Sequence, residues 1–142
     1  MKSNIYLVWA AALTFVALVL HLACIIFGGD WYRILGAGEE MAKMDEAGQL
    51  YPAVITSMIC VALATCVSYA LSGAGIVRRL PLLQLGLWAI AAVFLLRSVS
   101  FVFLMPLFPD NSFLFWVLSS TFCFVIGACY AVGAYRLRPL FS

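Results

Sequence analysis

Only a few side chains of this sequence could do chemistry, and they lie in or beside long apolar runs. His21 is the single histidine, and Arg97 is a basic residue inside an apolar run. An ionisable residue within a membrane span is costly and usually faces the protein interior, where it serves function. Arg97 could therefore pair with the anionic or carbonyl head of a ligand, and His21 could hydrogen-bond to that head.

The elements that must position these residues are membrane spans. The chain of 142 residues is 66% hydrophobic and 10% charged, whereas soluble domains carry about 25% charged residues. A span needs about 20 apolar residues, and the sequence has four such runs, 5–27, 52–72, 82–105 and 113–135. Because backbone polar groups must be satisfied within lipid, each run is predicted to be a helix. We predict an all-α polytopic membrane protein, an antiparallel four-transmembrane-helix bundle in a single domain over residues 1–142.

The distribution of charge predicts the orientation of these helices. All acidic residues lie in segments 28–51 and 106–112. Most basic residues lie in the alternate segments, at Lys2, Arg78, Arg79, Arg136 and Arg138. Short loops rich in lysine and arginine stay in the cytoplasm. Both termini are therefore predicted to be cytoplasmic, and segments 28–51 and 106–112 are predicted to lie outside, as expected for an integral protein of a bacterial inner (plasma) membrane.

The outer loop 28–51 is the only segment with the composition of a soluble protein. Residues 39–47 have a helical composition, with acids at the start and Gly48 as a possible C-terminal cap. This composition predicts a short helix with a solvated acidic face. Trp31 and Tyr32 suit the outer membrane interface, where amphipathic aromatic rings settle.

Helix rise places the polar side chains of all four spans at a similar depth. At about 1.5 Å per residue, His21 lies roughly 9 Å and Arg97 roughly 12 Å inside the outer ends of their spans. On the same rise, Ser57 falls at about 6–8 Å and Ser120 at about 9–12 Å. Small and polar residues pack helices together in lipid. In the first span these residues form the stripe Ala10, Thr14, Ala17, His21, Cys24 and Gly28. In the second span they form the stripe Ala53, Ser57, Cys60, Ala64 and Ser68. The pattern predicts one polar layer facing the bundle interior near the outer side.

We derive three hypotheses of function from this layer. In the first, an outward-opening pocket binds a lipid-like or amphipathic molecule beneath the outer loop. Its candidate ligand-binding residues are His21, Arg97, Ser57, Ser120, Asp30, Trp31, Tyr32, Arg33, Glu39 and Glu40. In the second, the protein is an accessory or assembly subunit whose acidic loop docks a membrane-protein partner, or it forms a homo-oligomer. In the third, it is an enzyme acting on a lipid-soluble substrate through His21 and Arg97.

Other classes of function find little support in the residues. The five cysteines include no Cys-x-x-Cys pair, so no disulfide framework or thiol motif is expected. No span carries an acidic residue, which argues against proton-coupled transport. No cofactor, metal site or nucleic-acid partner is expected, and the expected surroundings are the lipid bilayer. Arg97 could also pair with an acid of the outer loop, Asp30, Glu39 or Glu40.

Overall fold

The structure is a computed structural model, and it describes residues 4–35, 38–107 and 111–137. This part of the chain is helical and contains no strand. Its elements are α1 (Ile5–Phe27), α2 (Gly29–Ile34), α3 (Glu39–Glu46), α4 (Tyr51–Gly73), α5 (Leu83–Val99), α6 (Phe101–Leu104), the 3₁₀ turn η1 (Met105–Leu107) and α7 (Phe113–Leu137). Three helices, α1, α4 and α7, are long and apolar enough to cross a membrane, and there are four spans if α5 counts together with α6 and η1. The predicted all-helical class with membrane-crossing helices is confirmed.

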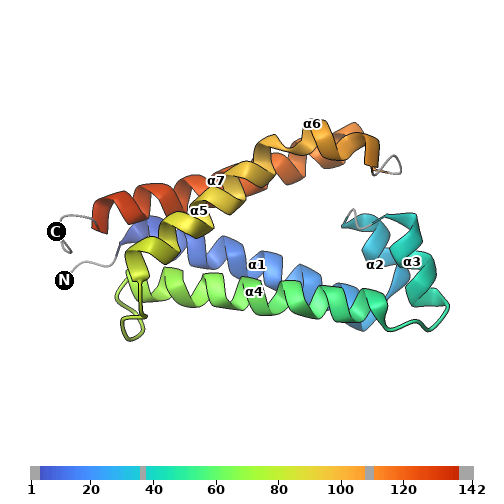
Figure 1. Cartoon of the computed structure of the whole chain (residues 1–142), viewed down its shortest axis with the longest axis horizontal. Helices are drawn as coiled ribbons and strands as arrows, with labels where there is room; N and C mark the ends of the chain where they lie inside the picture. The colour runs from blue at the N-terminus through green and yellow to red at the C-terminus, as the bar shows by residue number, and fades with distance from the viewer. Residues whose placement is uncertain (1–3, 36–37, 108–110, 138–142) are drawn as a thin grey trace.

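The long helices are arranged as two pairs (Figure 1). Helix α1 packs along α4, and α5 packs along α7. The pairs meet at the end where α1 begins and α7 ends, and they diverge toward the other end (Figure 1). Helices α2 and α3 lie at the diverging end, next to α1 and α4 (Figure 1). The molecule therefore has a joined end and an open end, which the predicted antiparallel four-helix bundle did not distinguish.

The joined end is built around Leu7, which has no exposed surface. Two glycines face it, because a Cβ atom on Gly73 or on Gly133 would overlap the Leu7 side chain. Without a hydrophobic driving force in lipid, helices associate where small residues let them approach closely. These two glycines thus let α4 and α7 close on α1.

Tyr130 of α7 marks where the two pairs begin to part. Its hydroxyl donates to the carbonyl oxygen of Cys66 in α4 at 2.9 Å. Its oxygen therefore accepts a hydrogen bond from the Thr14 hydroxyl of α1 at 3.1 Å. Its ring also stacks on Phe94 of α5, with centroids 5.9 Å apart. One buried side chain thus joins all four long helices.

The third predicted span is bent rather than straight. Helix α5 ends at Val99, and the segment 101–107 continues at an angle of 52° to it. The Ser98 hydroxyl donates a hydrogen bond to the carbonyl oxygen of Leu95 at 2.6 Å. The Ser100 hydroxyl donates one to the carbonyl oxygen of Leu96. Serine hydroxyls that bond carbonyls of the preceding turn bend helices. The straight helix to residue 105, from which the depth of Arg97 was expected, is therefore not what the structure has.

Candidate functional site between the helix pairs

Helices α2 and α3 are joined by one arginine. Arg33 contacts Asp30 at 2.9 Å, Glu39 at 2.8 Å and Glu46 at 2.7 Å. The hydrogen bonds from Arg33 lower the pKa of Glu39, and those to Glu39 and Glu46 raise the pKa of Arg33. Of the predicted site residues, Asp30, Arg33 and Glu39 are thus brought together, as an ion-pair cluster within the α2–α3 cap.

The two aromatic residues of α2 fix this cap to the long helices. Tyr32 is 1% exposed and packs with Cys24 of α1 and Ala42 of α3. Burial raises the pKa of Tyr32, and its hydroxyl lies against Thr56 of α4. Trp31 stacks on a neighbouring aromatic ring of α1, with centroids 5.4 Å apart. Both residues therefore attach the cap to the helices beneath it.

A close approach of α3 to the start of α2 holds the cap from its other side. Gly28 has a φ of 85°, and a Cβ atom there would meet the carboxylate of Asp45. A Cβ atom on Gly29 would likewise meet Glu46. Glycine reaches positive φ without steric cost, so Gly28 allows the chain to turn sharply, and the missing side chains of both glycines allow α3 to fold back.

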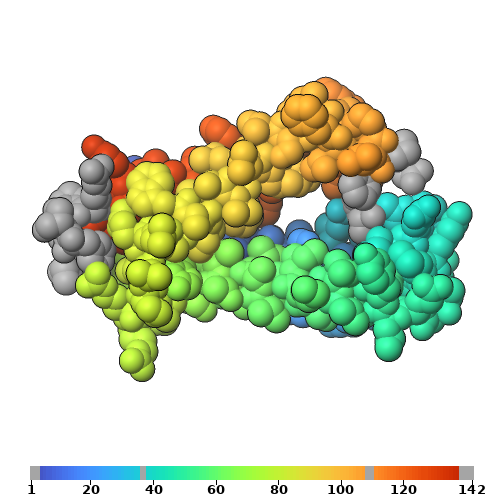
Figure 2. Space-filling model, in the orientation of Figure 1, coloured from blue at the N-terminus to red at the C-terminus, as the bar shows by residue number. Residues whose placement is uncertain are grey.

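An opening separates the two helix pairs beyond Tyr130. Figure 2 shows a gap that passes through the molecule between α4 and the α5–α6 segment, with α1 behind its lower edge.

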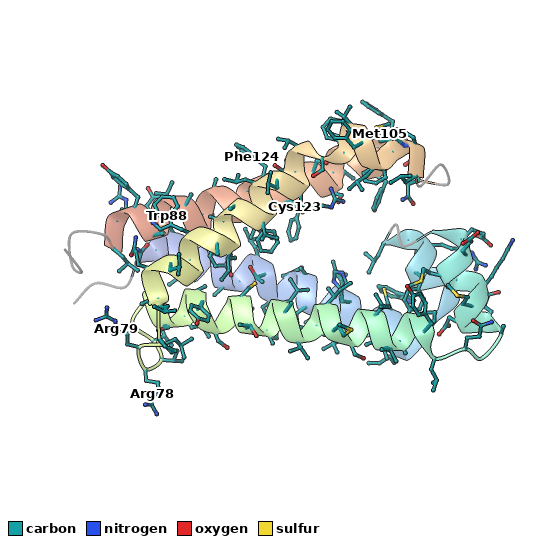
Figure 3. The ribbon with its side chains drawn as sticks, viewed as in Figure 1. Arg78, Arg79, Trp88, Met105, Cys123 and Phe124 are labelled. Carbon is teal, nitrogen blue, oxygen red and sulfur yellow. The ribbon has the colours of Figure 1, made fainter. Side chains whose placement is uncertain are left out.

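Helical periodicity identifies two residues that face this opening. His21 follows Thr14 by seven residues and so lies within about 20° of the same direction. Cys123 precedes Tyr130 by seven residues on α7. Figure 3 places Cys123 on the edge of the α5–α7 pair that faces α1 and α4, and Phe124 on the opposite edge.

His21 is half-buried and is held by its own helix. Its Nδ1 lies 2.7 Å from the carbonyl oxygen of Ala17. Because a carbonyl only accepts, Nδ1 carries the proton, and the Nε2 of the neutral ring is left as an acceptor. His21 can therefore accept a hydrogen bond from a group in the opening.

Arg97 lies in the other helix pair, in the last turn of α5. Its Nη2 donates to the Ser119 hydroxyl at 2.8 Å. Its guanidinium lies over the Trp116 ring at 5.5 Å from the centroid. Its Nη1 is buried and has no hydrogen-bond partner among the described residues. Ser120, which is 9% exposed, likewise has a buried hydroxyl without a partner in that part of the chain.

The acids expected as partners of Arg97 lie elsewhere. Asp30 and Glu39 are paired with Arg33, and Glu40 is exposed. Within the described ranges 4–35, 38–107 and 111–137, no carboxylate lies within salt-bridge distance of Arg97. The Arg97 contacts that the structure shows in this part of the chain are to Ser119 and Trp116.

Ser57 does not belong to this arrangement. It is exposed on α4, and the buried positions of that half of the helix are Pro52, Thr56, Cys60 and Leu63. The stripe predicted for this span shares only Cys60 with the buried face. It began at Ala53, one residue after the first buried position, Pro52. Thr56, the neighbouring hydroxyl, is the one that lies inside.

Three residues of the site were missed in the sequence. Tyr130 and Trp116 are buried aromatic residues with polar atoms, and such residues need hydrogen-bond partners inside a span. That signal could have drawn attention to them. Glu46 closes the Arg33 cluster, and only the fold of the cap shows it.

The described residues contain no group of three or more His, Cys, Asp or Glu side chains that could hold a metal ion. The five cysteines are free. Comparisons with protein-family models, with curated proteins and with solved structures give no match to this chain. The fold defines a small helical membrane protein, and the opening between its helix pairs is the feature from which its function is inferred.

Proposed function

We propose that this small integral membrane protein holds a lipid-like or amphipathic molecule between its two helix pairs. The α2–α3 cap would face the outside and the joined end the cytoplasm. Three exposed basic residues at the joined end, Arg78, Arg79 and Arg136, support this orientation through the positive-inside rule. The four helices would then form two antiparallel pairs, with the opening in the outer half of the membrane.

The opening itself carries the proposal. Gaps at this depth are surrounded by hydrocarbon, where there is no water to fill them. Phe94 stacks on the buried ring of Tyr130 and is itself only partly buried, and an acyl chain is the material that a membrane supplies to an apolar space. Apolar sites with a few convergent polar groups between bundle helices are ordinary ligand sites.

The polar groups of the opening suit one amphipathic molecule. Arg97 and Ser120 offer hydrogen-bond donors on the α5–α7 side, and His21 offers an acceptor on the α1 side. Donors on the α5–α7 pair and an acceptor on α1 can orient a head group while the tail lies among apolar side chains.

The two alternative functions have less support. A docking loop needs free carboxylates, and three acids of the cap are already paired with Arg33. An enzyme using His21 and Arg97 would rest on the single histidine of the sequence. Both alternatives remain predictions from the sequence.

Filling the opening tests the proposal. Cys123→Trp places a large side chain toward α1 and α4, whereas Phe124→Trp places one on the opposite edge (Figure 3). Native mass spectrometry of protein released from lipid nanodiscs would count retained lipid molecules. We expect Cys123→Trp to lose them and Phe124→Trp to keep the wild-type number.

The helical content and thermal unfolding of both variants would be checked by circular dichroism. If Cys123→Trp unfolds, the smaller Cys123→Phe takes its place. The proposal fails if a folded Cys123 variant retains as much lipid as Phe124→Trp.

A further inference from the structure

We infer that Arg97, with Ser119 and Ser120, binds the anionic head group, phosphate or carboxylate, of a lipid that reaches the opening sideways from the membrane. This inference rests on the proposed function and adds to it the chemical class of the ligand and its route.

The first argument is the uncompensated charge of Arg97. Within the described residues its contacts are a neutral hydroxyl and an aromatic ring. A buried charge without a partner is strongly destabilising, and a buried donor without an acceptor adds its own cost. Nη1 is such a donor. An anion with two oxygen atoms would supply both the charge and the acceptor, because the guanidinium fork matches carboxylate and phosphate geometry.

The second argument is the behaviour of Ser120. Hydroxyls inside membrane helices commonly bond a carbonyl of the preceding turn. Ser68 does so with Ala64 at 2.9 Å, and Thr65 with Val61 at 2.9 Å. Ser120 is nine-tenths buried, yet its hydroxyl makes no such bond. The Ser120 hydroxyl can therefore donate a hydrogen bond to a ligand. It lies one helical turn from Trp116, over whose ring the Arg97 guanidinium lies.

The third argument is the apolar surface beside Arg97. Arg97 lies in the last turn of α5, just before the bend that follows Val99. The segment beyond the bend exposes Val102, Phe103 and Leu107, which suits contact with acyl chains. A lipid whose head binds Arg97 would thus keep its tail in hydrocarbon.

The charge of the cap determines the route. Segment 28–51 carries five acidic residues and two basic ones, so it repels an anion that approaches from the water. The opening passes through the molecule between the helix pairs (Figure 2). An anionic lipid can therefore enter it from the surrounding leaflet without passing the cap.

The test measures which lipids are retained. Wild-type protein and Arg97→Gln would be reconstituted into nanodiscs of phosphatidylcholine mixed equally with phosphatidylglycerol or, in a second arm, with oleate. Native mass spectrometry would give the ratio of anionic lipid to phosphatidylcholine on the protein. We expect wild type to enrich the anion, and Arg97→Gln to lower that enrichment about tenfold or more, as for loss of a charge-assisted hydrogen bond.

Arg78→Gln is the matched control, because it removes an arginine from the exposed loop at the other end and should leave the enrichment unchanged. Enrichment of phosphatidylglycerol alone identifies a phosphate, and enrichment of oleate alone identifies a carboxylate. If Arg97→Gln does not fold, Ser120→Ala is measured instead. It should also lower the enrichment of anionic lipid, but by less. The inference is overturned if wild type shows no enrichment, or if the folded Arg97 or Ser120 variant keeps it.

The number of retained lipids separates this inference from the proposed function. Arg97→Gln should retain as many lipids as wild type but choose them differently, whereas Cys123→Trp should lose them. If Cys123→Trp loses lipid while Arg97→Gln still selects anions, only the head-group inference fails. If Cys123→Trp keeps its lipid, the opening holds none and the proposed function fails.

Discussion

The two ends of this molecule are held together by different forces. At the joined end, Leu7 packs against Gly73 and Gly133, and Tyr130 links the helices through buried hydrogen bonds. At the other end, the exposed Arg33 cluster joins two short helices of the cap. The contacts between the two helix pairs are thus buried and lie at the joined end, whereas the ion pairs of the open end lie within the cap.

The two arginines of the open end show the same division. Arg33 contacts three carboxylates within its own cap, so its charge is satisfied by the chain. Arg97 contacts a hydroxyl and an aromatic ring among the described residues. An arginine satisfied within the chain serves structure, whereas one left with a buried free donor is suited to a ligand.

The largest expected effect is at the centre of the joined end. Leu7→Ala would leave a cavity where three helices meet, and large-to-small core substitutions of this kind cost about 2–5 kcal/mol in soluble proteins. Because lipid is as apolar as leucine, moving the side chain out of lipid adds little, and most of the cost comes from the cavity. We therefore expect the free energy of unfolding to fall by about 2 kcal/mol. Leu118→Ala, at a residue 61% exposed on α7, should cost much less. Thermal unfolding in detergent, followed by circular dichroism, measures both, and equal losses would contradict a packed joined end.

Removing the Tyr130 hydroxyl should have an intermediate effect. Tyr130→Phe keeps the ring stacked on Phe94 and loses the hydrogen bonds to Thr14 and to Cys66. Interhelical hydrogen bonds in membranes are worth about 0.6 kcal/mol each, so we expect a loss of about 1 kcal/mol in the same unfolding assay. Tyr135→Phe, at an exposed position of α7, is the control and should show no loss. A larger effect at Tyr135 would mean that Tyr130 does not join the pairs.

The sequence predicted the inward face of one helix well and of another poorly. Ala10, Thr14 and Cys24 of the stripe on α1 are buried, whereas Ser57 of the stripe on α4 is exposed. Faces toward lipid and faces toward helices are both apolar in a membrane protein. A stripe shifted by one residue therefore looks as plausible as the correct one, which contains Thr56.

The bend after α5 and the partners of the arginines could not be read from spacing. No proline or glycine marks the bend, and only the serine hydroxyls of Ser98 and Ser100 explain it. Arg33 bonds Asp30 and Glu39, which lie three and six residues away. Contacts between residues so close in the sequence cost little chain entropy. Pairing these acids with Arg97 would have needed a long-range contact.

The smallest expected effect is at the cap, and it depends on pH. Because Arg33 lowers the pKa of Glu39, this ion pair stabilises the cap above the ordinary glutamate pKa of 4.5. Its contribution is lost as pH falls through the lowered pKa. We expect the amides of α3 to exchange hydrogen faster in acid, after correction for intrinsic rates, while the amides around Tyr130 stay protected.

Two glutamates next to each other provide the control. Glu39→Gln should raise exchange in α3 at neutral pH and flatten its dependence on acid, since the charge that titrates is gone. Glu40→Gln removes the same charge from an exposed side chain and should leave the acid dependence intact. If both variants respond alike, net charge rather than the Arg33 pair holds the cap. If the joined end also loosens in acid, the two ends are not held by different forces.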